Sequence, residues 1–406
     1  MTVGPQNSNK RKVAECVVDE AASTDFVYLD HAASTPMRRV AVEAMTPYMS
    51  GIYANPSGSH RFSRIARKAI DEARDDVAEL MGCKAGEVVF TSGGTEGDNA
   101  AIFGAVRRNA GVAVCSAAEH HAVLHCVESL KGQIVGVDAT GSIDIGSLEN
   151  VLNEAQVASR VGVVSVMAVN NEVGTISPMR QIAKVVRACA PDAILHTDAV
   201  QAACWQDLRE ISKLVDVLSI SAHKFGGPKG MGITMQRLGA QVDPLIMGGG
   251  QERDRRSGTH NVAGIIATAA ALRVTDSTRG AEVARVGRLR DALVDGVMGQ
   301  VDDALETVPR EKRVAGIAHM CFAGCESEEI LILLDEAMIC ASAASACASG
   351  AMEPSHVLTA MGVDKKFSAG ALRMSLGHTT TEREIDLAIE ALVGAVRRIR
   401  RNKIKA

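Results

Sequence analysis

Lys224 stands where a lysine could do covalent chemistry. Residues 221–230, Ser-Ala-His-Lys-Phe-Gly-Gly-Pro-Lys-Gly, place it just after an apolar run and at the start of a glycine-rich loop. A lysine that is partly buried at such a place has a lowered pKa, so its amine can form a Schiff base with a carbonyl group. A solvent-exposed loop lysine is the alternative, and the motifs around Lys224 weigh against it.

Two further motifs could hold the other parts of a charged ring cofactor. Thr91-Ser-Gly-Gly-Thr-Glu-Gly97 frees backbone N–H groups at the start of a predicted helix, which favours an anion such as phosphate. The motif lacks the lysine of a P-loop, so a capped tight turn stays an equal alternative. His196-Thr-Asp-Ala-Val-Gln201 places Asp198 after another apolar run, where its carboxylate could keep a pyridinium nitrogen protonated. Taken alone, this motif would favour a helix N-cap role for the aspartate.

Cys347 is the candidate nucleophilic thiol among 10 scattered cysteines. The segment Ala344-Ser-Ala-Cys-Ala-Ser-Gly350 surrounds it with small residues, which indicates an accessible loop, although a buried structural cysteine is the alternative. Cys340 ends an apolar run, so we expect it to be packed. Cys321 and Cys325 have a spacing that could suit a metal, but no second pair completes a site, and we expect no metal.

The elements that would position these residues alternate along the chain. Short apolar runs rich in β-branched residues predict strands buried on both faces, and helical stretches separate several of them. This rhythm predicts an α/β fold with a mostly parallel sheet covered on both sides. The expected strands are Val88–Thr91, Val112–Ser116, Ile134–Val137, Val161–Val169, Ala193–Thr197, Val217–Ile220 and Gly232–Met235. The expected helices cover 63–81, 98–108, 122–130, 147–155, 178–189, a long stretch through 290–298, and 382–399.

Length and composition favour two domains in a soluble chain. With 406 residues and 47% hydrophobic content, we expect a frayed tail at 1–25, a large domain at 26–270 and a smaller α+β domain at 271–406 that carries the Cys347 loop. The net charge of −4 gives no reason to expect direct nucleic-acid binding, and no apolar run is long enough to cross a membrane. The basic residues near the N-terminus precede no apolar core, so we expect a cytoplasmic protein.

Read together, the motifs resemble the fold-type-I pyridoxal 5'-phosphate (PLP) enzymes of the cysteine desulfurase family. The resemblance covers roughly Tyr28 to Leu392, and its short motifs follow one another in the family's order. They are Gly93-Gly-Thr95, Glu119-His120, Asn170-Asn-Glu-Val-Gly174, Asp198 with Gln201, and Ser221-Ala-His-Lys224. The resemblance implies a large PLP-binding domain with a mostly parallel seven-stranded sheet. It also implies conversion of L-cysteine to L-alanine, with the sulfur passing to an enzyme persulfide.

The resemblance also implies a role for each matching residue. Lys224 would hold the cofactor and then move the substrate's α-proton, and Cys347 would receive the sulfur. Arg373, in Ala371-Leu-Arg-Met-Ser-Leu-Gly377, would bind the substrate carboxylate together with Asn171. Residues that contact the cofactor would include His120 stacked on the ring, Asp198 at its nitrogen, Asn171 and Gln201 at its hydroxyl, Gly94, Thr95, Ser221 and His223 at its phosphate, and Thr259 offered to that phosphate by a partner subunit.

This resemblance implies a homodimer with shared active sites and a protein that accepts the sulfur. The acceptors of such enzymes serve iron–sulfur cluster assembly, cofactor biosynthesis, or tRNA and DNA thiolation. A selenocysteine lyase and a non-catalytic scaffold with the same fold are the alternatives. An aminotransferase or a decarboxylase fits less well, because neither reaction needs a thiol between small residues.

Overall fold

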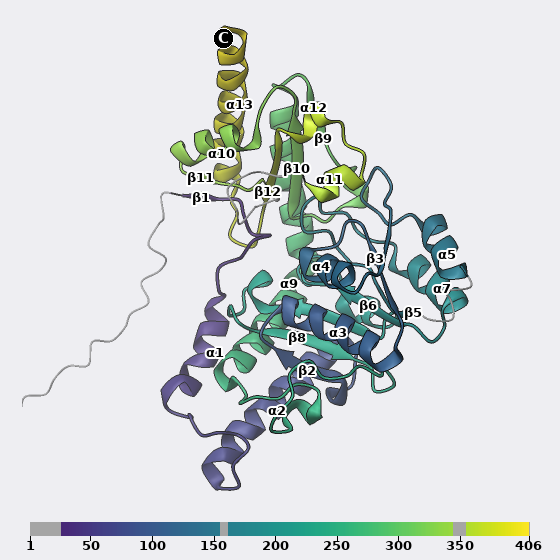
Figure 1. Ribbon diagram of the computed structural model, residues 1–406. Coiled ribbons are helices and arrows are strands. Elements are labelled where there is room, and N and C mark those ends of the chain that lie inside the picture. Colours follow the sequence, from purple (N-terminus) through teal and green to yellow (C-terminus); the bar gives the residue numbers. More distant parts are fainter. Residues whose placement is uncertain (1–25, 155–160, 344–354, 406) are drawn as a thin grey trace, which may run out of the picture.

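A seven-stranded sheet forms the centre of the protein (Figure 1). The computed structural model describes residues 26–154, 161–343 and 355–405, so the predicted N-terminal tail and Cys347 lie outside the described residues. The strand order is β2-β8-β7-β6-β5-β3-β4, and all neighbouring strands are parallel except those that pair with β8. The strands are β2 (Val88–Thr91), β3 (Val112–Ser116), β4 (Gln133–Val135), β5 (Val161–Ser165), β6 (Ile194–Asp198), β7 (Val217–Ser221) and β8 (Gly232–Gln236).

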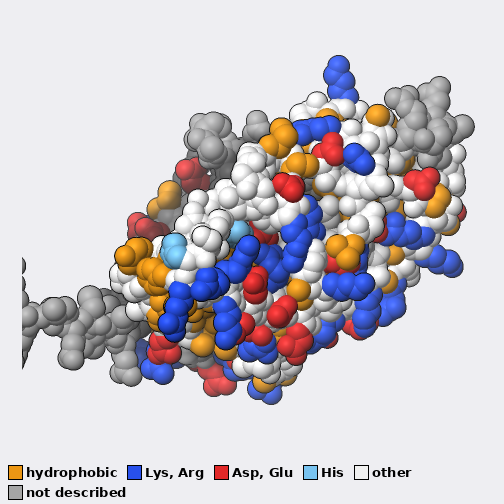
Figure 2. Space-filling model, turned by 90° about the horizontal axis from the view of Figure 1, so that it is seen from below, with side chains coloured by type: hydrophobic (Ala, Val, Ile, Leu, Met, Phe, Trp, Pro, Cys, Tyr) orange, Lys and Arg blue, Asp and Glu red, His pale blue; other side chains and the backbone are white. Residues whose placement is uncertain are grey.

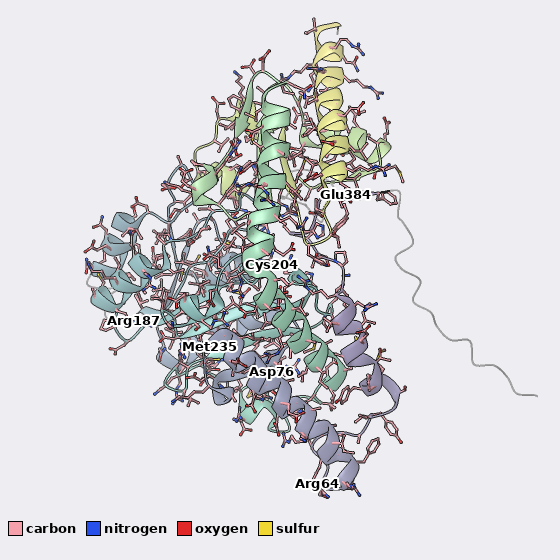
Figure 3. The ribbon with its side chains drawn as sticks, turned by 180° about the vertical axis from the view of Figure 1, so that it is seen from behind. Arg64, Asp76, Arg187, Cys204, Met235 and Glu384 are labelled. Carbon is pink, nitrogen blue, oxygen red and sulfur yellow. The ribbon has the colours of Figure 1, made fainter. Side chains whose placement is uncertain are left out.

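Helices cover both faces of this sheet because alternate strand residues point to opposite sides. Val163 and Ile194 pack with α3 (Gly94–Asn109) and α4 (His121–Ser129), which lie in front in Figure 1. Val164 and Leu195 belong to the core on the other side, which α2 (Arg61–Met81), α7 (Met179–Cys189) and α9 (Val262–Met298) cover (Figure 3). The predicted α/β fold class with a mostly parallel covered sheet is therefore confirmed.

A second hydrophobic core surrounds a small antiparallel sheet of order β12-β10-β9. Its strands are β9 (Ala304–Glu306), β10 (Ile317–Phe322) and β12 (Ala371–Ser375), and α10 (Ser327–Glu336) and α13 (Glu382–Lys405) pack on it. Near the N-terminus, β1 (Val27–Tyr28) pairs in parallel with β11 (Ile339–Cys340). Helix α9 contributes Leu272 to the first core and Leu293 to the second, so it runs through the predicted boundary at residue 270. That division stays a prediction.

The remaining helices are short or lie at the edges. They are α1 (Arg39–Ser50), α5 (Ile145–Asn153), α8 (Leu208–Ser212), α11 (His356–Ala360) and α12 (Lys365–Ser368), with 3₁₀ turns η1 (Ala85–Glu87), η2 (Ala222–Lys224), η3 (Gln251–Asp254) and η4 (Arg310–Lys312). No helix within the described ranges is both long and apolar enough to cross a bilayer. Seen from below, the surface carries basic and acidic side chains interspersed with apolar ones (Figure 2).

Several predicted boundaries differ from the structure, and two of these differences have a local cause. The strand predicted at Val161–Val169 ends at Ser165, because the next residues leave the sheet and Val169 pairs with Ile176 across a loop. The helix predicted from Asp98 begins at Gly94, so the glycine motif itself forms its first turn. Both differences place more polar residues at the end of the sheet where the strands meet their loops.

Candidate active site

A cavity of about 410 Å³ opens where β6 and β7 end, at the carboxyl ends of the parallel strands. Ligands of open α/β sheets bind at this edge, and the volume lies in the usual range for small-molecule sites. The lining comes from both cores and from the segment before α1. It comprises Asp30, Ala32, Ala33, Gly94, Thr95, Asp98, His120, Met167, Asn171, Asp198, Val200, Gln201, Ser221, His223, Lys224, Ser342 and Arg373.

Lys224 projects into this cavity from the 3₁₀ turn that follows β7. Its Nζ donates hydrogen bonds to the carbonyl oxygens of Ala32 at 2.5 Å and Ala33 at 2.9 Å. Burial, together with the nearby Arg373 guanidinium, lowers the pKa of Lys224 to about 8. An amine with this pKa is neutral for part of the time near neutral pH, which covalent chemistry on a carbonyl requires.

Asp198 ends β6 as a buried carboxyl that lacks a full cationic partner. One oxygen accepts a hydrogen bond from the Val200 backbone at 2.8 Å. Burial, with a smaller contribution from the carboxyl of Asp98, raises the pKa of Asp198 to about 8. A cation placed in the cavity would stabilise its ionised form, and the nitrogen of a pyridinium ring is such a cation.

The first turn of α3 leaves room for an anion beside Asp198. A Cβ atom on Gly94 would lie 2.5 Å from Cγ2 of Val200, so only glycine allows this close approach of helix and loop. Free N–H groups of the helix start face the same cavity as the side chains of Thr95, Ser221 and His223. Together with Asp198 and Lys224, this cradle fits the phosphate, ring nitrogen and aldehyde of PLP.

The other predicted cofactor contacts lie on the same cavity. His120 caps α4 by accepting a hydrogen bond from Ala122 N, and its ring stays open to the cavity. The protein around that ring and the charge of Lys224 nevertheless lower the pKa of His120 to about 4, so the ring is neutral. Gln201 donates its amide to the carbonyl of Ala32 at 2.9 Å.

Asn170 and Asn171 are neighbours with different roles. The buried amide of Asn170 holds its own loop by accepting from the backbone of Glu172 and Val173, both at 2.9 Å. Asn171 lines the cavity instead, and its carbonyl oxygen accepts a hydrogen bond from Arg373.

Arg373 lies in β12 and brings a second cation into the cavity. Its Nη1 donates to the carbonyl of Asn171 at 2.9 Å and its Nη2 to Oδ1 of Asp30 at 2.8 Å. Its Nε is buried and has no hydrogen-bond partner among the described residues. A guanidinium held in this way can bind a carboxylate through two parallel hydrogen bonds.

The described residues on either side of the segment that contains Cys347 are held next to this site. Ser342, before this segment, lines the cavity and exchanges both backbone hydrogen bonds with Arg373, at 2.8 and 3.1 Å. After the segment, His356 hydrogen-bonds through Nε2 to the carbonyl of Glu119 at 2.9 Å. Cys347 is the fifth residue after Ser342 in the sequence, and five extended residues can span at most about 17 Å.

None of the eight cysteines in the described part of the chain lines the cavity. Cys204, labelled in Figure 3, donates its thiol to the carbonyl of Lys224 at 3.4 Å, and burial raises its pKa to about 11. Cys340 lies in β11 and is half-buried, and burial raises its pKa too. Cys321 and Cys325 are buried, and within the described ranges no group of three or more potential ligands is placed to hold a metal.

Thr259 does not lie on the cavity wall of its own chain. It is exposed at the end of a segment that begins with three left-handed residues, Glu252, Arg253 and Asp254, with φ of 50°, 58° and 62°. Arg256 ties this segment to the phosphate cradle, because it forms a two-fold ion pair with Glu96, next to Thr95.

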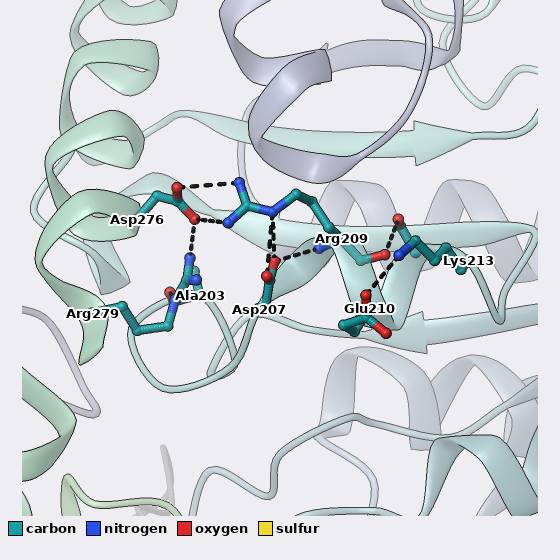
Figure 4. Close-up of polar contacts among 8 residues, drawn as sticks. Ala203, Asp207, Arg209, Glu210, Lys213, Asp276 and Arg279 are labelled. Atoms are coloured by element: carbon teal, nitrogen blue, oxygen red, sulfur yellow. Dashed lines mark hydrogen bonds and ion pairs between the residues drawn. The ribbon is translucent and has the colours of Figure 1, made fainter.

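Helix α9 holds the segment that follows Asp198 and Gln201 (Figure 4). The carboxylate of Asp276 in α9 accepts hydrogen bonds from both terminal nitrogens of Arg209, at 2.9 and 3.2 Å. It also accepts a hydrogen bond from Arg279 at 2.7 Å. Arg279 in turn donates to the carbonyl of Ala203 at 3.2 Å. The same helix therefore braces the loop that carries two of the predicted cofactor contacts.

Sequence reasoning missed Asp98, Glu119 and Asp30 as site residues. Asp98 lines the cavity, and burial raises its pKa to about 7. Glu119 is buried behind the cavity wall, where Oε1 accepts from Met167 N at 2.7 Å and Oε2 has no partner among the described residues. Asp98 directly follows the glycine motif and Glu119 directly precedes His120, so the sequence held a signal for both. Asp30 contacts its partner Arg373 only in the folded chain.

Comparison with known proteins agrees with this geometry. Residues 27–387 match the family aminotransferase class-V. An "IscS-like cysteine desulfurase" from Mycobacterium tuberculosis is 43% identical over 94% of this chain and 99% of its own length. A "Cysteine desulfurase IscS" from Dictyoglomus turgidum is 39% identical over 92% of this chain and 95% of its own length.

Solved structures show the same similarity. A structure titled "NIFS-LIKE PROTEIN" superposes with a TM-score of 0.84 at 32% identity, covering 92% of this chain and 99% of that one. A structure of SspA in complex with cysteine superposes with a TM-score of 0.73 at 30% identity, covering 86% of this chain and 98% of that one. The chain belongs to the class-V aminotransferase family and, within it, to the PLP-dependent cysteine desulfurases.

Proposed function

We propose that this protein converts L-cysteine to L-alanine in the cavity around Lys224, with PLP as cofactor and Cys347 as the thiol that takes the sulfur. One observation carries the proposal. Lys224, Asp198 and Arg373 line the same cavity, and Ser342, five positions before Cys347 in the sequence, exchanges backbone hydrogen bonds with Arg373.

The cofactor would be held by the residues that line its cradle. Lys224 would attach it, Asp198 would pair with its ring nitrogen, and the start of α3 with Thr95, Ser221 and His223 would bind its phosphate. His120 would lie against the ring, and Asn171 and Gln201 would lie at its hydroxyl. When bound, PLP withdraws electrons from the α-carbon of an amino acid.

The remaining chemistry would fall to three side chains. Arg373, with Asn171 beside it, would hold the substrate carboxylate and so orient the α-hydrogen towards Lys224. The Nζ of Lys224 would take the α-proton. The thiolate of Cys347 would attack the substrate's sulfur, so that an S–S bond forms, the C–S bond breaks and its electron pair stays with the carbon fragment. Protonation of that fragment would yield alanine and leave a persulfide on Cys347.

Two features beyond the single chain belong to the same proposal. Thr259 is exposed, and Arg256 beside it is tied to the phosphate cradle, which suits a homodimer in which each chain offers Thr259 to its partner's cofactor. A persulfide on a loop also needs a sulfur-acceptor protein. We place this chemistry in the cytoplasm, where thiols stay reduced; the cysteines in the described part of the chain are all free thiols.

The test replaces two cysteines in parallel. Cys347→Ala should retain the visible absorbance of bound PLP and lose alanine formation from cysteine, because the acceptor of the sulfur is gone. Cys340→Ala is the matched control, seven residues earlier, and should keep its activity. Normal alanine formation by Cys347→Ala would refute the assignment, and loss of activity in Cys340→Ala alone would move it to Cys340.

A further inference from the structure

Arg373 already binds a carboxylate of its own chain. The Oδ1 of Asp30 accepts from Nη2 of Arg373 at 2.8 Å, while the neighbouring Nε, on the same side of the guanidinium, has no partner among the described residues. The side chain of Arg373 is 6% exposed and that of Asp30 is 21% exposed. Asp30 therefore occupies only Nη2 of the two nitrogens, Nε and Nη2, that could bind a carboxylate together. Its side chain is also the more exposed member of the pair.

The backbone of Asp30 is fixed, but its side chain is held by one contact. The carbonyl of Asp30 accepts from the hydroxyl of Tyr28 at 3.1 Å and from the backbone of Ala33 at 3.0 Å. Among the described residues, the carboxylate makes no hydrogen bond other than the one to Arg373. It can therefore leave Arg373 by rotation of the side chain while the turn stays in place.

The turn that carries Asp30 also covers the second cation of the cavity. Two residues further along, the carbonyls of Ala32 and Ala33 accept the hydrogen bonds of Lys224. Arg373 lowers the pKa of Lys224, whereas the negative charge of Asp30 raises it. Asp30 thus offsets part of the repulsion between the two cations before any substrate is present.

We propose that Asp30 is an internal carboxylate that occupies Arg373 in the resting enzyme and that a substrate must displace through its own α-carboxylate. The inference rests on the proposed role of Arg373 as the carboxylate site. A substrate carboxylate can bind both Nε and Nη2, whereas Asp30 binds one nitrogen, so the incoming group replaces one charge-assisted hydrogen bond with two. An amine without a carboxylate cannot displace Asp30 from Arg373. Asp30 is therefore a residue that determines specificity for substrates with an α-carboxylate.

The experiment measures competitive inhibition of sulfide release by the holoenzyme with two small amines, in the presence of excess dithiothreitol, which reduces the persulfide and releases its outer sulfur as sulfide. L-alanine carries the carboxylate, and ethylamine is the same amine without it. In Asp30→Asn, the inhibition constant of alanine should fall roughly tenfold, because the internal competitor is lost. The inhibition constant of ethylamine should stay the same. Asp30→Ser, which lacks both the charge and the reach, should have the same two effects as Asp30→Asn: a lower inhibition constant for alanine and an unchanged one for ethylamine.

Alanine binding that is unchanged or weaker in both variants would overturn the inference, because Asp30 would then only orient Arg373. Asp295→Asn, which removes one exposed charge elsewhere, should leave both constants unchanged. Arg373→Gln separates the two levels of the argument. If it leaves alanine binding intact, the proposed carboxylate site is wrong; if it weakens binding while Asp30→Asn does not tighten it, only the role of Asp30 fails. Retained PLP absorbance checks that each variant is folded.

Discussion

Three charged side chains in the cavity differ in how their charges are balanced. Arg373 has Asp30 as a full ionic partner, whereas Lys224 is held only by backbone carbonyls. Asp198 has one backbone hydrogen bond and a second carboxyl, Asp98, close enough to raise its pKa. The cavity of the polypeptide alone therefore has an amine that tends to lose its proton and a carboxyl that tends to keep one.

Replacement of Lys224 tests the reactive amine. Lys224→Ala should lose the visible absorbance that PLP gains when it is attached to a lysine. It should also lose at least about a hundredfold in the rate of alanine formation, because the base for the α-proton is gone. Absorption spectra of the purified variant with added PLP provide the measurement. A retained band would place the attachment at another lysine.

The buried acids make the stability of the cofactor-free protein depend on pH. Burial raises the folded-state pKa of Asp198 to about 8 and of Asp98 to about 7, so these two groups bind more protons in the folded state than in the unfolded state above about pH 4. These two carboxyls should therefore destabilise the folded protein increasingly as the pH rises from about 4 towards 8. Each group contributes a slope of at most about 1.4 kcal/mol per pH unit.

Asp198→Asn should remove the contribution of Asp198 to the pH dependence of the free energy of unfolding, measured by urea denaturation of the cofactor-free protein. The exposed Asp192→Asn is the control and should leave the slope unchanged. An Asp198→Asn variant as pH-dependent as the parent protein would mean that Asp198 is ionised even without a cofactor.

At the scale of elements, the loop after β8 shows how a strained segment is fixed. Glu252 is buried, and its carboxylate accepts a two-fold hydrogen bond from Arg74 of α2, at 2.6 and 2.7 Å, and one from His260 at 2.8 Å. Burial opposes ionisation of Glu252, but the bonds from His260 and Arg74 outweigh it and lower the pKa to about 2. These bonds hold three consecutive left-handed residues, each of which costs about 1–2 kcal/mol outside glycine.

Glu252→Ala should lower the free energy of unfolding by about 3–5 kcal/mol, because it leaves Arg74 as a buried charge without its carboxylate. Glu210→Ala is the matched control: it breaks ion pairs with Arg180 and Lys213 that lie at the surface, and should cost much less than Glu252→Ala. Chemical denaturation of both variants gives the two values. Equal losses would show that the buried pair has no special weight.

The sequence predicted these elements far better than the contacts between them. All seven strands of the central sheet were located, because each is an apolar run between polar loops. The ion pairs could not be predicted in the same way. Asp30 and Arg373 are 343 residues apart in the chain, and Arg74 and Glu252 are 178 apart. No local pattern links such residues; only the packing of the two cores places them together.

At the scale of the whole molecule, the arrangement of Thr259 predicts a dimer. The protein should elute from a sizing column with twice the mass of one chain, and Thr259→Val should bind PLP more weakly because its partner's phosphate loses a hydrogen bond. The decisive mixture pairs Thr259→Val with Lys224→Ala chains. Because each site takes Lys224 from one chain and Thr259 from the other, the mixed dimer should contain one complete site that binds PLP with full affinity and one site that lacks both groups. Full-affinity PLP binding by Thr259→Val would contradict shared sites.

The central claim is that sulfur leaves cysteine in the Lys224 cavity and arrives on Cys347. The most direct measurement is peptide mass spectrometry of the holoenzyme after one turnover with L-cysteine and without an acceptor or reductant. We expect one extra sulfur atom on the peptide that contains Cys347, and one alanine formed per modified chain. Alanine formed with the extra sulfur on another cysteine, or with no sulfur retained by the protein, would contradict the account.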